Sequence, residues 1–302
     1  MGDVVGWYSC GCEPFPVVIK PTNMKAFTIL CPTDFSECSL NAIEYAAKLG
    51  EKYRARLILF HVPDRDDYLK LFSKQQEEEN FMLFSKTKLD NLVSEVGKES
   101  LPQGLQSCEA IVREGNVVDT ILAYAEEAEV DLIVMGTEGV NDFKTNYIGT
   151  RSSKVIARSE HDVFIIPRKV FFKVPRKLVY ATDYVEADKL ALQKVVDLAS
   201  FYDAEIDVVH VGTRLRAIDK ALHQTMITEL KPFVRYEKVN YLLKSYRDEP
   251  GLGLENYLIT AKGDVLITLS KKKSWFDQIF TKNLSKKMSY FINKPLLVIK
   301  KV

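Results

Sequence analysis

Residues 131–152 read DLIVMGTEGVNDFKTNYIGTRS, and this stretch decides how the chain is interpreted. A short apolar run ends at Gly136, and Gly139 follows after two residues. After nine further residues comes Gly149, directly followed by Thr150. Glycines let backbone N–H groups approach a phosphate closely, and the start of a helix favours negative charge there. The stretch therefore predicts a phosphate-binding loop between a strand and a helix, and the alternative is an ordinary glycine-containing turn.

Length and composition narrow the class of protein. The 302 residues suffice for two domains that each bury a core, and the net charge of +1 argues against a general nucleic-acid binder. No run approaches the roughly 20 apolar residues that span a bilayer, and the first residues do not read as a secretory signal. We therefore expect no transmembrane segment and no nucleic-acid partner.

The cysteines are odd in number and scattered, at Cys10, Cys12, Cys31, Cys38 and Cys108. Such a set favours reduced thiols in a cytoplasm over a disulfide framework. Cys10 and Cys12 have no second Cys or His pair at zinc-site spacing, so no metal site is expected. These features predict a cytoplasmic location.

The chain repeats itself. Thr-Asp at residues 33–34 recurs 149 residues later at 182–183. Further on, Asp-Leu-Ile at 131–133 matches Asp-Val-Leu at 264–266, where the offset is 133. The second copy thus has a shorter middle, and a period near 150 indicates a duplicated domain instead of a solenoid.

Each copy alternates strand-like and helix-like runs. Strands are expected at 27–31, 56–61, 107–113, 132–135 and 163–166, and again at 178–181, 205–210, 234–241, 265–269 and 296–299. Helices are expected at 36–53, 68–96, 117–128 and 152–159, and again at 189–202, 215–230 and 251–261. Such alternation predicts α/β architecture with doubly wound parallel sheets and right-handed crossovers. We divide the chain into an N-terminal extension (1–23), a first domain (24–168), a linker (169–175) and a second domain (176–302).

Together these features resemble the universal stress protein family, in its ATP-binding branch, which carries the same glycine pattern. Upstream, ILCPTDFS at 29–36 is similar to the family's first strand and LILFHV at 57–62 to its second. DVFIIP at 162–167 is similar to its last strand. The resemblance covers 24–168 well and 176–302 more loosely. It implies two tandem Rossmann-like, adenine nucleotide α-hydrolase-like domains, each with strand order 3-2-1-4-5.

That strand order makes strands one and four neighbours, at the crevice where ligands of open α/β sheets bind. The resemblance then implies that Asp34 and Val62 lie near ribose and adenine, and that the glycine loop cradles the phosphates. For Asp34 the alternative is a helix N-cap, and both roles can hold together. The predicted cofactor is ATP, with or without Mg²⁺. The predicted site consists of Pro32, Thr33, Asp34, Val62, Met135, Gly136, Gly139, Gly149, Thr150, Arg151 and Ser152.

Two residues depart from the family pattern. Glu138 stands where many ATP-binding relatives have His, so a negative charge is expected close to the phosphates. Arg151 stands at a position that is usually apolar or small, and it could pair with a phosphate or with Glu138. These changes weaken the prediction of tight ATP binding but leave the glycine scaffold in place.

The second copy lacks that scaffold. At the 133-residue offset, Gly136 becomes Leu269, Gly139 becomes Lys272 and Gly149 becomes Lys282. Side chains there would block close approach of the backbone, so the second domain is predicted to be a degenerate copy without ATP. Its loop at 271–287 is rich in lysine, which suits either a solvated basic face or an anionic partner such as a lipid surface or another protein.

No catalytic constellation is visible. The four histidines form no recognisable triad, and neither a Walker A motif nor a Gly-x-Ser-x-Gly elbow occurs. His61 and His210 end matching strands and are expected to pack structurally. We therefore expect a protein that is not an enzyme, with slow ATP hydrolysis left open.

The leading hypothesis is a tandem universal stress protein that binds ATP in its first domain and acts as a nucleotide-responsive stress regulator on an unknown protein partner. One alternative is a protein- or membrane-binding adaptor with a vestigial nucleotide site. Another is an enzyme of the wider superfamily, although the Ser-Gly-Gly loop expected after strand one is absent. The resemblance implies dimerisation through the last strands, and exposed edge strands invite such pairing. The last strands of the copies, 163–166 and 296–299, are therefore expected to pair as an intramolecular pseudo-dimer. That pairing would leave the chain monomeric or free to form a homodimer through another face.

Overall fold

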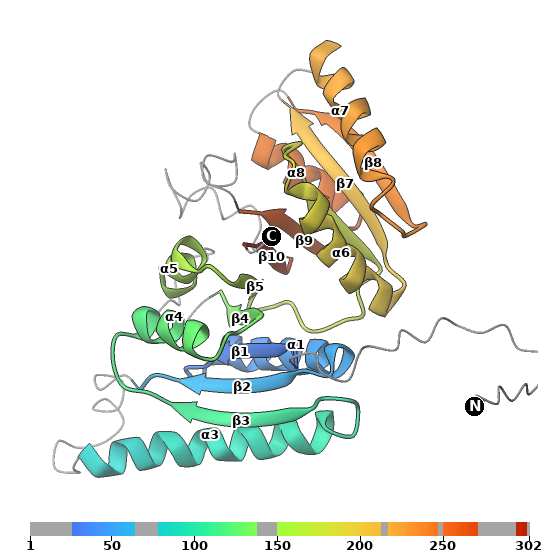
Figure 1. Ribbon diagram of the computed structural model, residues 1–302. Coiled ribbons are helices and arrows are strands. Elements are labelled where there is room, and N and C mark those ends of the chain that lie inside the picture. Colours follow the sequence, from blue (N-terminus) through green and yellow to red (C-terminus); the bar gives the residue numbers. More distant parts are fainter. Residues whose placement is uncertain are drawn as a thin grey trace, which may run out of the picture.

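The computed structural model describes residues 26–63, 78–137, 150–212, 217–246, 250–270 and 294–300 (Figure 1). The predicted N-terminal extension, most of the glycine loop and the lysine-rich loop lie outside these residues. The first half of the chain has the strands β1 (Thr28–Pro32), β2 (Arg56–His61), β3 (Ser107–Val112), β4 (Leu132–Gly136) and β5 (Asp162–Ile166). The second half has the strands β6 (Lys177–Ala181), β7 (Glu205–Gly212), β8 (Val239–Ser245), β9 (Val265–Leu269) and β10 (Leu296–Ile299). The helices are α1 (Glu37–Tyr53), α3 (Glu78–Ser100), α4 (Val117–Glu127), α5 (Thr150–Arg158), α6 (Asp188–Tyr202), α7 (Ala217–Leu230) and α8 (Pro250–Thr260).

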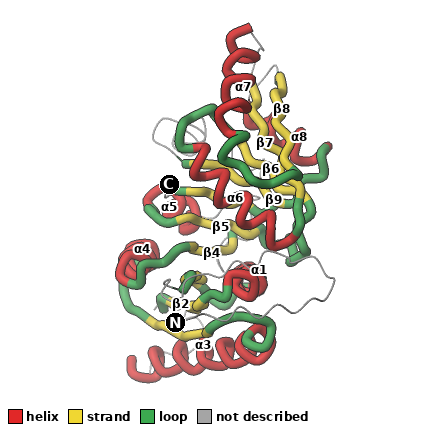
Figure 2. Tube along the Cα trace, turned by 45° about the vertical axis from the view of Figure 1, so that its right-hand side comes forward, coloured by secondary structure: helices red, strands yellow, loops and turns green. Residues whose placement is uncertain are grey.

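The strands form one twisted ten-stranded sheet in the order β3-β2-β1-β4-β5-β10-β9-β6-β7-β8 (Figure 2). Counted from its outer edge, each half has the order 3-2-1-4-5, which confirms the predicted fold class. All pairs of neighbouring strands are parallel except β5 and β10, which run antiparallel with Phe164 opposite Leu297. The predicted pairing of the two last strands is therefore confirmed, and it joins the halves at what we call the seam.

The sequence repeat extends to the register of the strands. Ile29 of β1 lies opposite Leu132 of β4, and their counterparts Leu178 and Val265 lie opposite each other in the second half. Both offsets read from the sequence, 149 and 133, thus hold within the sheet. The two halves can be compared residue by residue near strands one, two, four and five.

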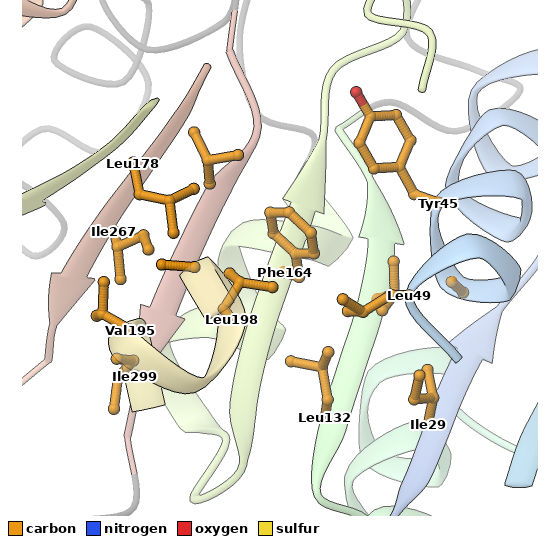
Figure 3. Packing of buried hydrophobic residues seen from close by; sticks show 14 of the residues in the cluster. Ile29, Tyr45, Leu49, Leu132, Phe164, Leu178, Val195, Leu198, Ile267 and Ile299 are labelled. Atoms are coloured by element: carbon orange, nitrogen blue, oxygen red, sulfur yellow. The ribbon is translucent and has the colours of Figure 1, made fainter. Parts of the chain in front are cut away.

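Helices cover both faces of the sheet. α1, α3, α6 and α7 pack on one face and α4, α5 and α8 on the other, because alternate strand residues point to opposite sides. The core of the first face continues across the seam, where Leu49 of α1 and Leu198 of α6 lie on the same side of the sheet as Phe164 (Figure 3). No helix in the described part of the chain is both long and apolar enough to span a bilayer.

The segment between the halves is held against both of them. The hydroxyl of Tyr45 in α1 donates to the carbonyl of Phe171 at 2.9 Å, and its ring meets the ring of Phe172 edge-on at 5.2 Å. The ammonium of Lys173 forms an ion pair with Asp264 at the start of β9. The linker is thus fixed to α1 on one side of the seam and to the second half on the other.

This ion pair predicts a pH dependence. Burial opposes ionisation of Asp264, but the ammonium of Lys173 and the backbone N–H groups of Arg176 and Lys177 outweigh it and lower the pKa of the carboxyl. Because the pKa is lower in the folded than in the unfolded state, this contribution to stability is complete at neutral pH and is lost as the pH falls below about 4. We expect Lys173→Met to lower the free energy of unfolding at neutral pH and progressively less on acidification, as measured by urea denaturation. An equal loss of unfolding free energy at neutral pH and below about pH 4 would contradict this prediction.

One strand differs from its predicted position. β8 was expected at 234–241 and is observed at Val239–Ser245, because the backbone N–H of Val234 still donates to Leu230 at the end of α7. The hydroxyl of Tyr236 donates to the carbonyl of Ala204 at 2.6 Å, so the apolar run before β8 packs as a connection. The first part of the helix predicted at 68–96, residues 68–77, lies outside the described residues, and α3 is described from Glu78 to Ser100. The other predicted elements within the described residues are present, with ends shifted by a few residues.

Candidate functional site

The turn after β1 is held in a tight conformation by side chains. The backbone N–H of Thr33 donates to the carbonyl of Phe60 at 2.8 Å, which extends the pairing with β2. The Thr33 hydroxyl accepts from the N–H of Phe35 at 3.0 Å and lies 2.9 Å from the Ser39 hydroxyl. Phe35 has φ 61°, in the left-handed region that side chains rarely adopt. The turn thus presents residue 34 at the carboxyl end of β1.

Asp34 is not the N-cap of α1. The cap is Ser36, whose Oγ accepts from the N–H of Ser39 at 3.2 Å. The Asp34 carboxylate instead accepts from the Ser36 N–H at 3.1 Å and from the Ser36 hydroxyl at 2.6 Å. The alternative role considered for Asp34 is therefore wrong, and the aspartate orients the true cap while it faces a pocket.

That pocket lies where strands β1 and β4 end side by side. All predicted site residues in the described part line it except Thr150, which lines an adjoining cavity. Gly139 and Gly149 lie outside the described residues. The pocket is lined by Pro32, Thr33, Asp34, Ser39, Phe60, Val62, Val117, Ile121, Met135, Gly136, Arg151 and Ser152. The sequence prediction missed Ser39, Phe60, Val117 and Ile121, although Val117 is the first residue of the helix expected at 117–128.

Gly136 has a packing role in addition to the predicted one. A Cβ at this position would lie 2.6 Å from the Cys38 Sγ and 2.9 Å from the Cys38 carbonyl oxygen. The glycine therefore lets the first turn of α1 contact the end of β4. The carbonyl of Gly136 accepts from the Ser152 hydroxyl at 2.7 Å, which ties the start of α5 to the same point.

The start of α5 supplies positive charge. The first backbone N–H groups of a helix have no partner within the helix and favour an anion. Arg151 lines the pocket itself, and Lys154 and Arg158 line the adjoining cavity of about 740 Å³. The pocket alone holds only about 60 Å³, so a ligand as large as a nucleotide has to extend into this cavity. Arg158 is paired with Asp119 at 2.6 Å.

Both histidines that end strands serve the structure. The Nδ1 atom of His61 lies 2.7 Å from the carbonyl oxygen of Thr33, and burial lowers the pKa of this imidazole. His210 makes the same contact with the carbonyl of Thr182 at 2.8 Å. The predicted packing role of both residues is confirmed, and the described residues contain no cluster of three or more side chains suited to a metal ion.

The thiols of Cys31, Cys38 and Cys108 are free. Burial raises the pKa of Cys108 to about 12 and that of Cys31 further, so neither is a thiolate at neutral pH. The expectation of reduced cysteines stays a prediction, and Cys10 and Cys12 lie outside the described residues.

Comparisons with known proteins agree with this fold. The model of the universal stress protein family matches residues 26–167. A universal stress protein of Methanocaldococcus jannaschii is 30% identical over 154 residues, covering 47% of this chain and 94% of that protein. The chain belongs to the universal stress protein family. A second universal stress protein of the same archaeon is 26% identical over 147 residues, covering 46% of this chain and 81% of its own length.

A solved structure matches both halves of this universal stress protein. The crystal structure of a universal stress protein from Archaeoglobus fulgidus covers 92% of this chain and 97% of its own, with a TM-score of 0.69 and 18% identity. At this identity the likeness concerns the fold alone. The two universal stress proteins of Methanocaldococcus jannaschii match about half of the chain, whereas the Archaeoglobus fulgidus structure covers 92% of it.

The corresponding place in the second half of this universal stress protein is closed by side chains. Leu269, at the position of Gly136, is 6% exposed. Asp188, at the position of Ser39, is 1% exposed. Its carboxylate accepts from the Tyr180 hydroxyl at 2.5 Å, from the Thr182 hydroxyl at 2.6 Å and from a backbone N–H. A leucine and a buried acid therefore stand where the first half has a glycine and a serine.

Proposed function

We propose that the first half of this universal stress protein, within a domain of residues 24–168, binds one ATP at the pocket between β1 and β4. The observation that carries the proposal is the meeting of three features at one pocket: the Asp34 turn, Gly136 and the start of α5. The glycine pattern typical of the ATP-binding branch of the family leads into the same helix. Bound ATP, with or without Mg²⁺, would make the chain a nucleotide-responsive stress regulator.

The lining of the pocket matches the parts of a nucleotide. Val62, Val117 and Met135 form an apolar wall suited to a purine ring. The Asp34 carboxylate offers an acceptor for ribose hydroxyls. Arg151 and the N–H groups of α5 offer charge and donors to phosphates, with the residues of the adjoining cavity behind them. We propose binding as the function, since both strand-end histidines are engaged with backbone carbonyls.

Calorimetry on the full chain tests this proposal, with matched variants in the two halves. We expect one ATP per chain, weakened about tenfold by Asp34→Asn, because a charged acceptor for the ribose is lost. Asp183→Asn, at the corresponding position of the second half, should leave the affinity unchanged. Two ATP per chain, or an equal effect of the two substitutions, would show that the site is assigned to the wrong place.

The rival function, a protein-binding adaptor, is favoured by apolar side chains exposed on the second half. Ile218 and Leu222 lie one turn apart on α7 and are 58% and 50% exposed, and Phe233 just beyond the helix is 58% exposed. Exposed apolar clusters often mark contacts with a partner. If ATP fails to bind while a protein is captured in an Ile218- and Leu222-dependent manner, the adaptor becomes the better account.

A further inference from the structure

A second cavity lies far from the nucleotide pocket, at the seam on the face covered by α1 and α6. Its volume of about 580 Å³ is in the range of small-molecule sites. Phe27 and Tyr53 form one wall as a stacked pair with ring centroids 4.3 Å apart. Leu198 of α6 and Ile299 of β10 belong to the lining as well, so both halves build the cavity.

Negative charge dominates the lining. The carboxylate side chains in it belong to Glu126, Glu129, Asp131, Asp162 and Asp197. Against these stand Lys194, whose ammonium lies 2.7 Å from the Asp162 carboxylate, and the imidazole of His161. Such a lining attracts a cation and disfavours an anion such as a phosphate.

A buried histidine also faces this cavity. His161 is 4% exposed, and its Nδ1 atom has no hydrogen-bond partner among the described residues. Its Nε2 atom lies 3.0 Å from the Glu126 carboxylate, but the angles do not make a hydrogen bond. Buried polar atoms are nearly always paired, so this ring marks a place where a polar ligand group or water is accommodated.

The internal repeat allows the aspartate at this cavity to be compared with its counterpart in the second half. Asp131 accepts from the backbone N–H of Thr28 through Oδ2 at 2.8 Å, and its counterpart Asp264 accepts in the same way from Lys177 at 3.2 Å. On the second side the other oxygen of Asp264 takes the ammonium of Lys173. The Asp131 carboxylate makes the same backbone contact as Asp264, but it lines the cavity of about 580 Å³ at the seam.

The linker also brings an aromatic ring to the second side. Phe172, adjacent to Lys173, packs edge-on against Tyr45, and both linker residues line a remaining space of only about 30 Å³. One side of the seam is thus filled by an aromatic ring and an ammonium from consecutive residues. The other side has a matching aspartate, an aromatic wall and about 580 Å³.

We propose that the cavity at the seam binds a small aromatic amine. Its ammonium would pair with the Asp131 carboxylate, as the ammonium of Lys173 pairs with Asp264 on the other side. Its ring would pack against the stacked pair Phe27 and Tyr53. An ammonium close to aromatic faces gains further attraction from the ring quadrupoles.

The probe for this site is phenethylamine, with 3-phenylpropionate as an anion of similar shape, titrated into the full-length protein by calorimetry. We expect saturable binding of the amine with one site per chain and no binding of the anion. Binding does not depend on nucleotide, so the experiment is independent of the proposed ATP site. Equal binding of the two compounds, or no binding of the amine at millimolar concentration, would overturn the proposal.

Matched variants locate the site. Asp131→Asn keeps an acceptor for the Thr28 N–H but removes the charge, and it should weaken amine binding about tenfold or more. Asp264→Asn, the counterpart across the seam, should leave binding unchanged. Asp197→Lys changes an exposed position of the lining and should abolish amine binding. This variant provides a second test in case the Asp131 variant does not fold. Wild-type affinity in both the Asp131 and the Asp197 variants would refute the site.

Discussion

Replacing Asp188 by leucine is expected to lower the free energy of unfolding by about 3 kcal/mol. The Tyr180 hydroxyl, the Thr182 hydroxyl and the Val185 N–H all donate to this carboxylate. Tyr180 and Thr182 are 0% and 2% exposed, so water cannot replace the lost acceptor without rearrangement. Urea denaturation of the full chain measures the change.

The first half offers a matched control for this substitution. Ser39 stands at the position of Asp188, and within the described part of the chain its hydroxyl forms hydrogen bonds with the Thr33 hydroxyl and the Ser36 carbonyl. Ser39→Ala should therefore cost about 1 kcal/mol. If both substitutions cost the same, Asp188 is not the organising group of its cluster.

The second large effect is expected from exchanging the residues at the ends of β4 and β9. Leu269→Gly removes a buried side chain and should cost about 2–5 kcal/mol, since a cavity remains and glycine adds flexibility. Gly136→Leu should cost about 1–3 kcal/mol through overpacking against Cys38. The leucine should also abolish ATP binding, because its side chain would occupy the pocket.

Denaturation and calorimetry on the two variants separate packing from ligand binding. Leu269→Gly should not gain ATP binding, because Asp188 remains buried nearby in the second half. A Gly136→Leu variant that folds and binds ATP like wild type would contradict the place assigned to the phosphates. ATP bound by the second half of Leu269→Gly would show that the leucine alone excludes the nucleotide.

The parts of the fold that were predictable from sequence are those with a local signal. The internal repeat is visible in the sequence, because Thr33-Asp34 recurs at 182–183 and the last strands of the copies match. The register of the sheet follows the same offsets. With the strand order 3-2-1-4-5 implied by the family resemblance, the pocket residues at the ends of β1 and β4 were predictable, because the carboxyl ends of adjacent parallel strands share one edge. The pairing of β5 with β10 was expected from the family resemblance, which implies pairing of the last strands, and from two short apolar strands at the ends of their copies.

Features that depend on competition or on three-dimensional contacts were not predictable in this way. The run before β8 has the composition of a strand. Its backbone instead bonds to the end of α7, and the Tyr236 hydroxyl donates to the Ala204 carbonyl, so the run does not join the sheet. Asp34 and Ser36 both suit an N-cap, and only the geometry selects Ser36. No sequence pattern marks the replacement of Ser39 in the first half by Asp188 in the second. Its role became visible only from the hydrogen bonds that Asp188 accepts.

The joining of both halves in one chain has an evolutionary consequence. In a symmetric homodimer each substitution at the interface appears twice, so the two sides of the axis cannot differ. Here Asp162 pairs with Lys194 on one side of the seam, while the corresponding positions on the other side are Pro295 and Tyr45. A covalent link between the copies frees each from this constraint. One copy can then drift away from an ancestral ligand while its partner is still under selection to bind it.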